Sequence, residues 1–273
     1  MEQIITIGKW LLPLLYLALV IDYGASFILR VRPVGRGTWL LAVAGLHALY
    51  LALLGVYGNW GLLAGPYAIP SVVALSMVLV YAIVELATRD RRTGVFVLAL
   101  AFLFQYTSSM FLSAAAGPAE PTRAESAWGG IHVIPALLSY TALALASVYG
   151  LLYLLVRRGL KRRRFGVLFD RLPPLEMLGK MSWHALLTGF AFMTVAIITA
   201  GVLFGAQSGG QGAVAPGPKV MAKIVTGSVA WVIYAAAIFG KLFGKWSLAR
   251  ISMVALAGFV VVLLLLVASG IMS

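Results

Sequence analysis

The sequence predicts an all-α integral membrane protein, a bundle of about eight transmembrane helices with both termini facing outward. Its composition is 62% hydrophobic and only 11% charged, whereas about a quarter of the residues in a soluble domain are charged. Apolar segments follow one another along the chain, each close to the roughly 20 residues that a helix needs to cross a bilayer. Basic residues gather in every second connection between these segments, as in multi-pass membrane proteins.

The predicted spans account for most of the 273 residues. Their ranges are 4–28, 38–57, 67–87, 94–115, 130–156, 181–205, 219–240 and 250–271. The connections between them are short, and the chain shows neither a soluble domain nor an internal repeat. We therefore expect a single polytopic membrane domain over residues 1–273.

Positive charge sets the predicted orientation. The connections that follow the first, third, fifth and seventh spans, counted with Arg250 at the start of the eighth span, hold 17 of the 21 lysines and arginines. Cytoplasmic loops are enriched in these residues, so these connections are predicted to be cytoplasmic and the protein to lie in the plasma (inner) membrane. The net charge of +13 then reflects topology and contact with membrane lipid, and not nucleic-acid binding. The cluster Arg157–Arg164 has a second interpretation, as a docking site for a cytoplasmic partner or for haem propionates.

Three histidines are the main candidates for chemistry in a chain that has no cysteine. Without cysteine there is no disulfide, no thiolate metal site and no covalent attachment of haem. His132 follows Trp128 at the outward mouth of the fifth span, and a neutral imidazole is a good axial ligand for haem iron. The alternative for His132 is an interfacial histidine that is hydrogen-bonded to a carbonyl group.

The other two histidines lie at different depths. His47 falls near the middle of the second span, where a histidine is either functional or bonded to a neighbouring helix. His184 lies at the cytoplasmic end of the sixth span, which favours a snorkelling or loop-bonded residue. At 1.5 Å per residue, His132 and His184 lie nearly a membrane apart and are not expected to share one iron.

Other polar and aromatic residues extend this picture. Asp22 and Glu85 lie toward cytoplasmic span ends and are expected to pair with nearby arginines. Lys223, at the outward start of the seventh span, either snorkels or meets a carboxylate such as a haem propionate. The apolar loop that contains Trp60 is either an interfacial belt or a lid over an outer site. No nucleophile triad, phosphate loop or paired carboxylate site is evident, so no catalytic activity of its own is expected.

From residue 128 onward, several short motifs occur in an order and spacing that resemble the cytochrome c assembly family, the membrane proteins of the CcsA, CcmC and HemX kind. The motifs are Trp128-x-x-x-His132-Val133, Ser139-Tyr140, Tyr149-Gly-Leu-Leu-Tyr153, Leu172-Pro-Pro-Leu-Glu176, Gly189-Phe190, Trp231-Val-Ile-Tyr234 and Gly258-Phe259. The resemblance covers roughly residues 128–260 in motif, which we take as the core, and most of the chain in architecture.

The resemblance implies haem handling and also differs from the family pattern. It places His132 on the family's first outer histidine, Lys223 on a family lysine and His47 near an intramembrane histidine. The family's tryptophan-rich segment would fall at about 214–224, where the tryptophans and acidic residues are absent, and another family histidine would fall at Phe239. The chain is therefore most similar to the HemX-like branch.

Three functions remain open from the sequence. In the first, the protein binds non-covalent haem b and acts with apocytochrome c and other assembly subunits. His132 and His47 would ligate iron, Lys223 would neutralise a propionate, Trp128 and Trp60 would supply aromatic surface, and His184 is a further cofactor-binding candidate. In the second, it is a HemX-like regulatory or assembly protein that delivers no haem. In the third, it is a small-solute transporter, although the sequence does not show the broken helices and repeats of many transporters.

Overall fold

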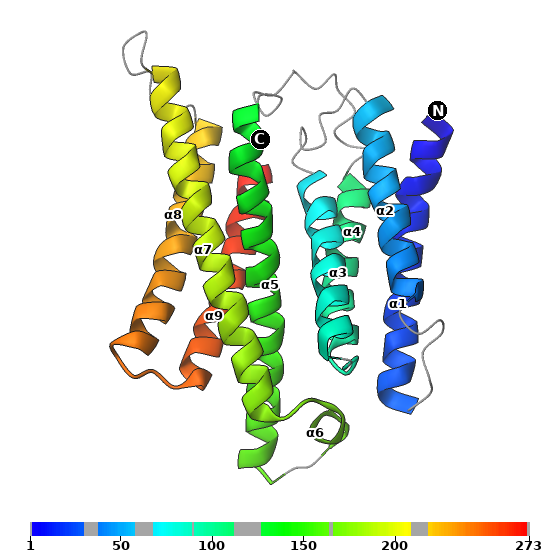
Figure 1. Ribbon diagram of the computed structural model, residues 1–273, viewed down its shortest axis with the longest axis vertical. Helices are drawn as coiled ribbons and strands as arrows, with labels where there is room; N and C mark the ends of the chain where they lie inside the picture. The colour runs from blue at the N-terminus through cyan, green and yellow to red at the C-terminus, as the bar shows by residue number, and fades with distance from the viewer. Residues whose placement is uncertain are drawn as a thin grey trace. The chain divides into compact units, whose positions relative to one another are not determined.

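The computed structural model describes residues 2–29, 38–57, 68–88, 90–111, 127–163, 166–208 and 218–271 (Figure 1). Within these ranges the regular structure is entirely helical. The helices are α1 (Glu2–Leu29), α2 (Thr38–Tyr57), α3 (Ala68–Thr88), α4 (Gly94–Phe111), α5 (Ala127–Lys161), α6 (Val167–Arg171), α7 (Leu175–Ser208), α8 (Pro218–Leu242) and α9 (Leu248–Ile271). The prediction of an all-α fold is confirmed.

Eight of these helices correspond to the eight predicted spans, and α6 is a short addition. Six contain a segment long and apolar enough to cross a membrane: Thr6–Leu29, Ile69–Leu86, His132–Lys161, Leu175–Val202, Ile224–Leu242 and Leu248–Leu265. The apolar parts of α2 and α4 are shorter, Thr38–Leu54 and Gly94–Met110. The chain is a multi-pass membrane protein, while the direction in which its termini face stays a prediction.

Helix α7 begins six residues before the predicted start of its span. Its first residue, Leu175, follows Pro173 and Pro174, and the amide of Leu178 donates to the carbonyl of Pro174 at 3.2 Å. Proline is well tolerated just before and at a helix start. In the first turns, Lys180 pairs with Glu176 at 2.8 Å. Because these turns carry exposed charged side chains, hydropathy alone placed the start of the span later.

The chain packs as two compact units. Unit 1 comprises Met1–Ser126 and Gly166–Pro173, and unit 2 comprises Ala127–Phe165 and Pro174–Ser273. In unit 1, α4 packs against α1 and α3, and α2 packs against the same two helices. Buried tyrosines fill its interior, among them Tyr16 and Tyr81.

Unit 2 is built around α5, which packs against α7 and α9, while α8 packs against α9 and α7. Small residues allow these close crossings. A Cβ on Gly189 would lie 2.8 Å from the Leu143 side chain, and one on Gly258 would lie 2.8 Å from Ile233. The glycines of the sequence motifs are therefore packing residues.

Hydroxyl groups link the same helices. Ser139 donates to the carbonyl of Gly189 at 2.8 Å, Ser182 to that of Ala146 at 2.9 Å, and Ser147 to that of Ala255 at 3.1 Å. All three serines are buried. Such side-chain-to-carbonyl bonds hold helices together where lipid offers no hydrophobic drive for association.

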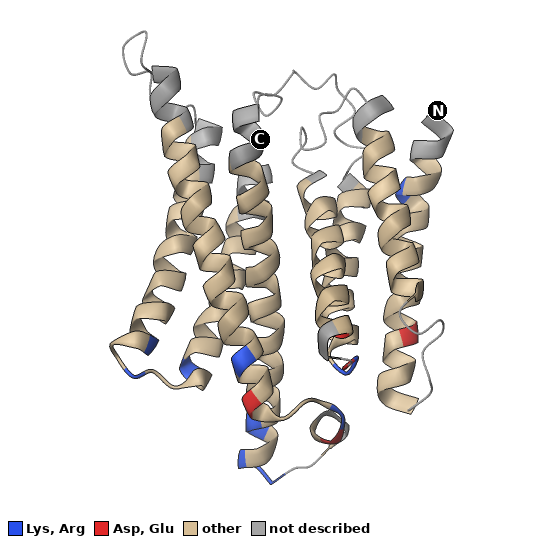
Figure 2. Ribbon diagram, viewed as in Figure 1, with Lys and Arg blue, Asp and Glu red and all other residues tan. Residues whose placement is uncertain are grey.

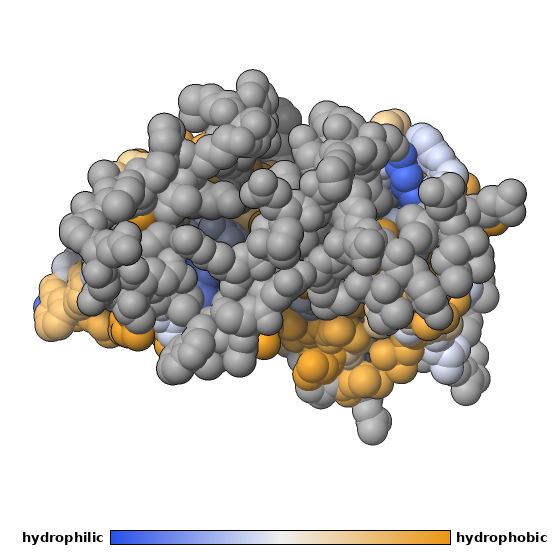
Figure 3. Space-filling model, turned by 90° about the horizontal axis from the view of Figure 1, so that it is seen from above, coloured by the Kyte–Doolittle hydropathy of each residue, from blue (hydrophilic) through white to orange (hydrophobic). Residues whose placement is uncertain are grey.

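In each unit, most of the described lysines and arginines lie at one end, called here its basic end (Figure 2). In unit 1 they are Arg91, Arg92 and Arg171, and in unit 2 they include Arg157, Lys161, Lys180, Lys241 and Arg250. Away from these ends, large apolar side chains are exposed on the helices, for example Leu14, Ile198 and Leu264. Figure 3 shows hydrophobic residues at the surface in the view from above. Exposed apolar surface of this extent is expected where helices face lipid.

Candidate functional site

His132 lies in the second turn of α5, at the end of unit 2 opposite its basic end. Its Nδ1 is 2.8 Å from the carbonyl oxygen of Ala196 on α7. A carbonyl oxygen can only accept, so Nδ1 carries a proton, and in the neutral imidazole Nε2 then keeps a lone pair. Among the described residues, none forms a hydrogen bond with Nε2, and the ring is only partly buried. Histidines that bind metals commonly donate their other N–H in this way, which fixes the ring and raises its basicity.

The turn that carries His132 is linked to α7 by this contact. Pro135 lies inside α5 and has no N–H, so it cannot complete the helical hydrogen bond to the carbonyl four residues before it. The bond from His132 to Ala196 therefore adds a tie between the start of α5 and α7. Ala196 also accepts from the hydroxyl of Thr199 at 3.0 Å, so its carbonyl is a fixed acceptor. The contact with Ala196 matches the carbonyl-bonded interpretation of His132, and its role as a ligand stays a prediction.

The aromatic and cationic candidates around His132 are placed only by their backbone. Trp128 lies in α5 four residues before His132, and residues four apart share a helix face. Lys223 lies in the second turn of α8. The side chains of Trp128 and Lys223, and the whole of Trp60, lie outside the described part of the structure.

Two aromatic motif residues join α7 to α8 away from His132. The rings of Phe190 and Trp231 lie 5.4 Å apart, and the Trp231 indole N–H donates to Thr194 at 3.0 Å. Thr194 and Ala196 are two residues apart and so about 200° apart around α7. The Phe190–Trp231 pair and His132 therefore contact different faces of α7, and the pair does not form a shelf beside the histidine.

His184 is exposed on α7. It precedes Ala196, the residue that His132 contacts, by 12 positions, which is about 18 Å along a helix. The two rings are too far apart to share one iron, as their predicted depths imply. Among the described residues, no group of three or more His, Cys, Asp or Glu side chains could hold a metal ion.

His47 is fully buried in unit 1 and bonded through both ring nitrogens. Nδ1 is 2.8 Å from the hydroxyl of Tyr16, and Nε2 is 2.9 Å from the hydroxyl of Ser71. Ser71 donates to Oε1 of Gln105 at 2.7 Å, and the Gln105 amide donates to Ser109 at 3.1 Å. This chain of five residues, here called the His47 chain, joins α1, α2, α3 and α4.

The direction in which protons are donated along the His47 chain fixes which ring nitrogen of His47 carries the proton. Ser71 uses its proton on Gln105, so it accepts from Nε2–H of His47, and Nδ1 accepts from Tyr16. The ring is neutral, and every member has a partner within an apolar interior. Sequence reasoning found His47 but not Tyr16, Ser71 or Gln105. The sequence feature that could have identified these three residues is that each is a polar side chain inside an apolar span.

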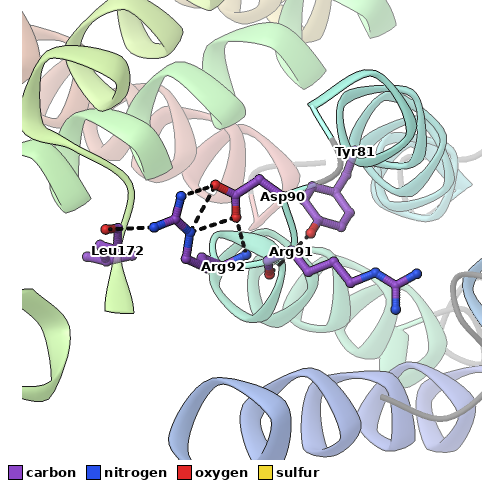
Figure 4. A network of polar contacts seen from close by, with 5 residues as sticks. All are labelled: Tyr81, Asp90, Arg91, Arg92 and Leu172. Atoms are coloured by element: carbon purple, nitrogen blue, oxygen red, sulfur yellow. Dashed lines mark hydrogen bonds and ion pairs between the residues drawn. The ribbon is translucent and has the colours of Figure 1, made fainter. Parts of the chain in front are cut away.

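The basic end of unit 1 contains paired charges, as expected for Glu85. Its Oε1 is 2.7 Å from Nε of Arg91, and its Oε2 accepts from the Tyr23 hydroxyl at 2.6 Å. In the next pair, Arg92 donates from Nε to Asp90 at 2.9 Å and from Nη1 to the carbonyl of Leu172 at 3.5 Å. Figure 4 shows the Arg92 guanidinium bonded to Asp90 and to the Leu172 carbonyl, with the guanidinium of Arg91 pointing away from this group.

The charge pair shifts the titration of Asp90. Partial burial raises the pKa of this carboxyl, but the side-chain and backbone hydrogen bonds from Arg92 and its positive charge outweigh burial and hold the pKa below its usual value. Asp90 is therefore ionised at neutral pH and keeps the Arg92 guanidinium in place.

Comparison with known proteins agrees with the motifs. The family model described as cytochrome C assembly protein matches residues 64–273. Two relatives, each called cytochrome c biogenesis protein CcsA, come from Heterosigma akashiwo strains NIES-293 / 8280G21-1 and CCMP452 / OLISTH. Each is 25% identical over 219 residues, which cover 68% of this chain and 66% of the relative. The chain thus spans just under two thirds of those relatives, and no solved structure matches it. With its helical membrane fold and its motifs on α5, α7, α8 and α9, the chain belongs to the cytochrome c assembly protein family.

Proposed function

We propose that this protein handles haem in cytochrome c biogenesis and that His132 ligates the haem iron. The hydrogen bond from Nδ1 to the Ala196 carbonyl carries the proposal, because it leaves the Nε2 lone pair directed away from the protein's own acceptor. Family membership supports the same process. Haem b would be held without a covalent bond, since the chain has no cysteine.

Three further residues have a part in this proposal. Ala196 orients the imidazole and makes Nε2 a stronger donor to iron. Trp128, one turn earlier on the same face of α5, supplies aromatic surface. Lys223 of α8 offers a positive charge to a propionate. The haem is cargo that is carried or presented to apocytochrome c, together with other assembly subunits in the plasma (inner) membrane.

His47 enters the proposal under a condition. To ligate iron within the membrane, its Nδ1 must first give up the hydrogen bond from Tyr16. Replacing Tyr16 by Phe removes that competitor. If His47 holds haem, the haem content of the Tyr16→Phe variant rises; if His47 serves only to join helices, stability falls and haem content does not change.

The test is the absorption spectrum of detergent-purified protein, oxidised and then reduced with dithionite, for wild type, His132→Ala and His184→Ala. His184 is a matched control because it is exposed and about 18 Å along α7 from the His132 contact. We expect the Soret band to weaken in His132→Ala and to persist in His184→Ala. Equal bands in all three proteins, at equal thermal stability, would remove His132 from the site.

A HemX-like regulatory or assembly protein is the second candidate. It is favoured by the hydrogen bonds on both ring nitrogens of His47. Because these bonds occupy His47, it is not available as a second histidine ligand to a haem that His132 would bind. The exposed residues Arg158, Lys161, Arg162 and Arg163 would then contact a cytoplasmic partner. Pull-down with these four neutralised discriminates: loss of a partner supports regulation, and retention leaves the cluster as a topology signal.

A further inference from the structure

We propose that the basic end of unit 1 binds the phosphate headgroup of an anionic phospholipid. A pocket of about 220 Å³ opens there. Three elements form it, namely the end of α1, the turn between α3 and α4, and the short helix α6. Its lining residues are Ser26, Phe27, Arg91, Arg92, Asp170 and Arg171.

Two arginines supply the donors. Arg171 uses one N–H, from Nη2 to the carbonyl of Ile28 at 3.3 Å, and a guanidinium has five N–H groups. Arg92 is fixed by Asp90 and by the Leu172 carbonyl, and one N–H on each Nη remains beyond those bonds. Ser26 adds a hydroxyl on the α1 side. A planar, fixed guanidinium matches the geometry of phosphate oxygens.

The carboxylates at this end have separate roles. Asp90 and Glu85 are each bonded to an arginine, so they hold guanidinium groups in place. Asp170 is exposed on the pocket wall and forms no such bond with an arginine in the described part of the chain. It therefore opposes an incoming anion, which predicts opposite effects for neutralising Asp170 and neutralising Arg171.

An apolar stripe on α1 points to a lipid and not to free phosphate. Ile7, Leu14, Ile21 and Ile28 are exposed by 61%, 62%, 62% and 60%. Residues seven apart share one face of a helix, so the four form a continuous stripe along α1. The stripe ends at Ile28, whose carbonyl binds Arg171. An acyl chain lying along this stripe would bring its headgroup to the pocket.

The position in the membrane agrees with this ligand. The pocket lies at the basic end, which the charge pattern predicts to be cytoplasmic. Anionic lipids give the cytoplasmic leaflet its negative surface potential, and basic pockets between transmembrane helices on that side bind anionic headgroups. The pocket is independent of the His132 site, so the two proposals stand or fall separately.

The test is native mass spectrometry of the full chain in detergent with added phosphatidylglycerol or phosphatidylcholine. We expect wild type to prefer phosphatidylglycerol, Arg171→Gln to bind it about tenfold more weakly, and Asp170→Asn to bind it more tightly. Arg250→Gln is the matched control, because it removes an exposed arginine from the basic end of unit 2.

Four results would each overturn the proposal. The first is equal retention of both lipids by wild type. The second is the same affinity in Arg171→Gln and Arg250→Gln, and the third is weaker binding in Asp170→Asn. The fourth is displacement of phosphatidylglycerol by millimolar inorganic phosphate, which would identify a site for the free anion. Because Asp170→Asn removes a repulsive charge from an exposed position, its gain in affinity cannot be explained by loss of folding.

Discussion

Removing the hydroxyl of Ser71 should destabilise the protein more than removing any other buried serine hydroxyl for which contacts are described. Ser71 accepts from His47 and donates to Gln105. In Ser71→Ala both bonds are lost and two buried side-chain groups, Nε2–H and Oε1, are left unpaired. An unpaired buried polar group costs about 1–3 kcal/mol, and hydrogen bonds between membrane helices contribute only about 0.6 kcal/mol on average. We therefore expect a loss of about 2 kcal/mol in the free energy of unfolding.

Ser147→Ala is the matched control for this prediction. Ser147 is 2% exposed, against 3% for Ser71, so both substitutions remove one buried oxygen. Its hydroxyl donates only to the backbone carbonyls of Leu143 and Ala255, which also accept bonds within their helices. We expect its loss to cost less than 1 kcal/mol. Unfolding by denaturing detergent, followed by circular dichroism, measures both; an equal or larger loss in Ser147→Ala would refute the reasoning.

Three other predictions concern different parts of the molecule. The pKa of Asp90 is depressed in the folded protein, so its stabilising contribution is present above the unfolded pKa of about 3.9 and is lost as pH falls through the lower folded pKa. The difference in unfolding free energy between wild type and Asp90→Asn should therefore be constant near neutrality and shrink below about pH 4. A difference that grows on acidification would contradict this sign. Gly189→Ala should lower the unfolding free energy by about 1–3 kcal/mol through overpacking. Gly45→Ala should be neutral or stabilising, because nothing lies within 4 Å of a Cβ at that position. Equal melting temperatures for the two variants would disprove the packing role of Gly189. Trp231→Phe should lose its bond to Thr194 and some stability but leave the haem spectrum unchanged, so a shifted Soret band would show that the aromatic pair reaches the cargo.

Hydropathy and charge predicted depth along the membrane but not rotation about each helix. The spans were found because a lipid environment imposes a length and a composition. Depth alone separated His132 from His184. It could not show that Trp231 contacts a different face of α7 from His132, because that depends on which helices are neighbours.

The hydrogen-bond partners were harder to predict for a physical reason. His132 is held by the carbonyl of Ala196, and a backbone acceptor has no signature in the sequence. The partners of His47 are ordinary polar side chains, and only the packing of four helices brings them together. The pocket at the basic end of unit 1 depends on α6, five residues that a search for spans treats as a connector.

Chemical rescue tests the central claim, that Nε2 of His132 ligates haem iron, most directly. Hemin is added to purified His132→Ala with and without millimolar imidazole, beside wild type, and the reduced spectrum is recorded. The account predicts that the Soret band is weaker in the variant than in wild type and is restored by imidazole, which supplies the missing nitrogen donor to a folded protein. A variant whose spectrum matches wild type without imidazole, or one that imidazole does not restore although it is folded, would contradict the claim.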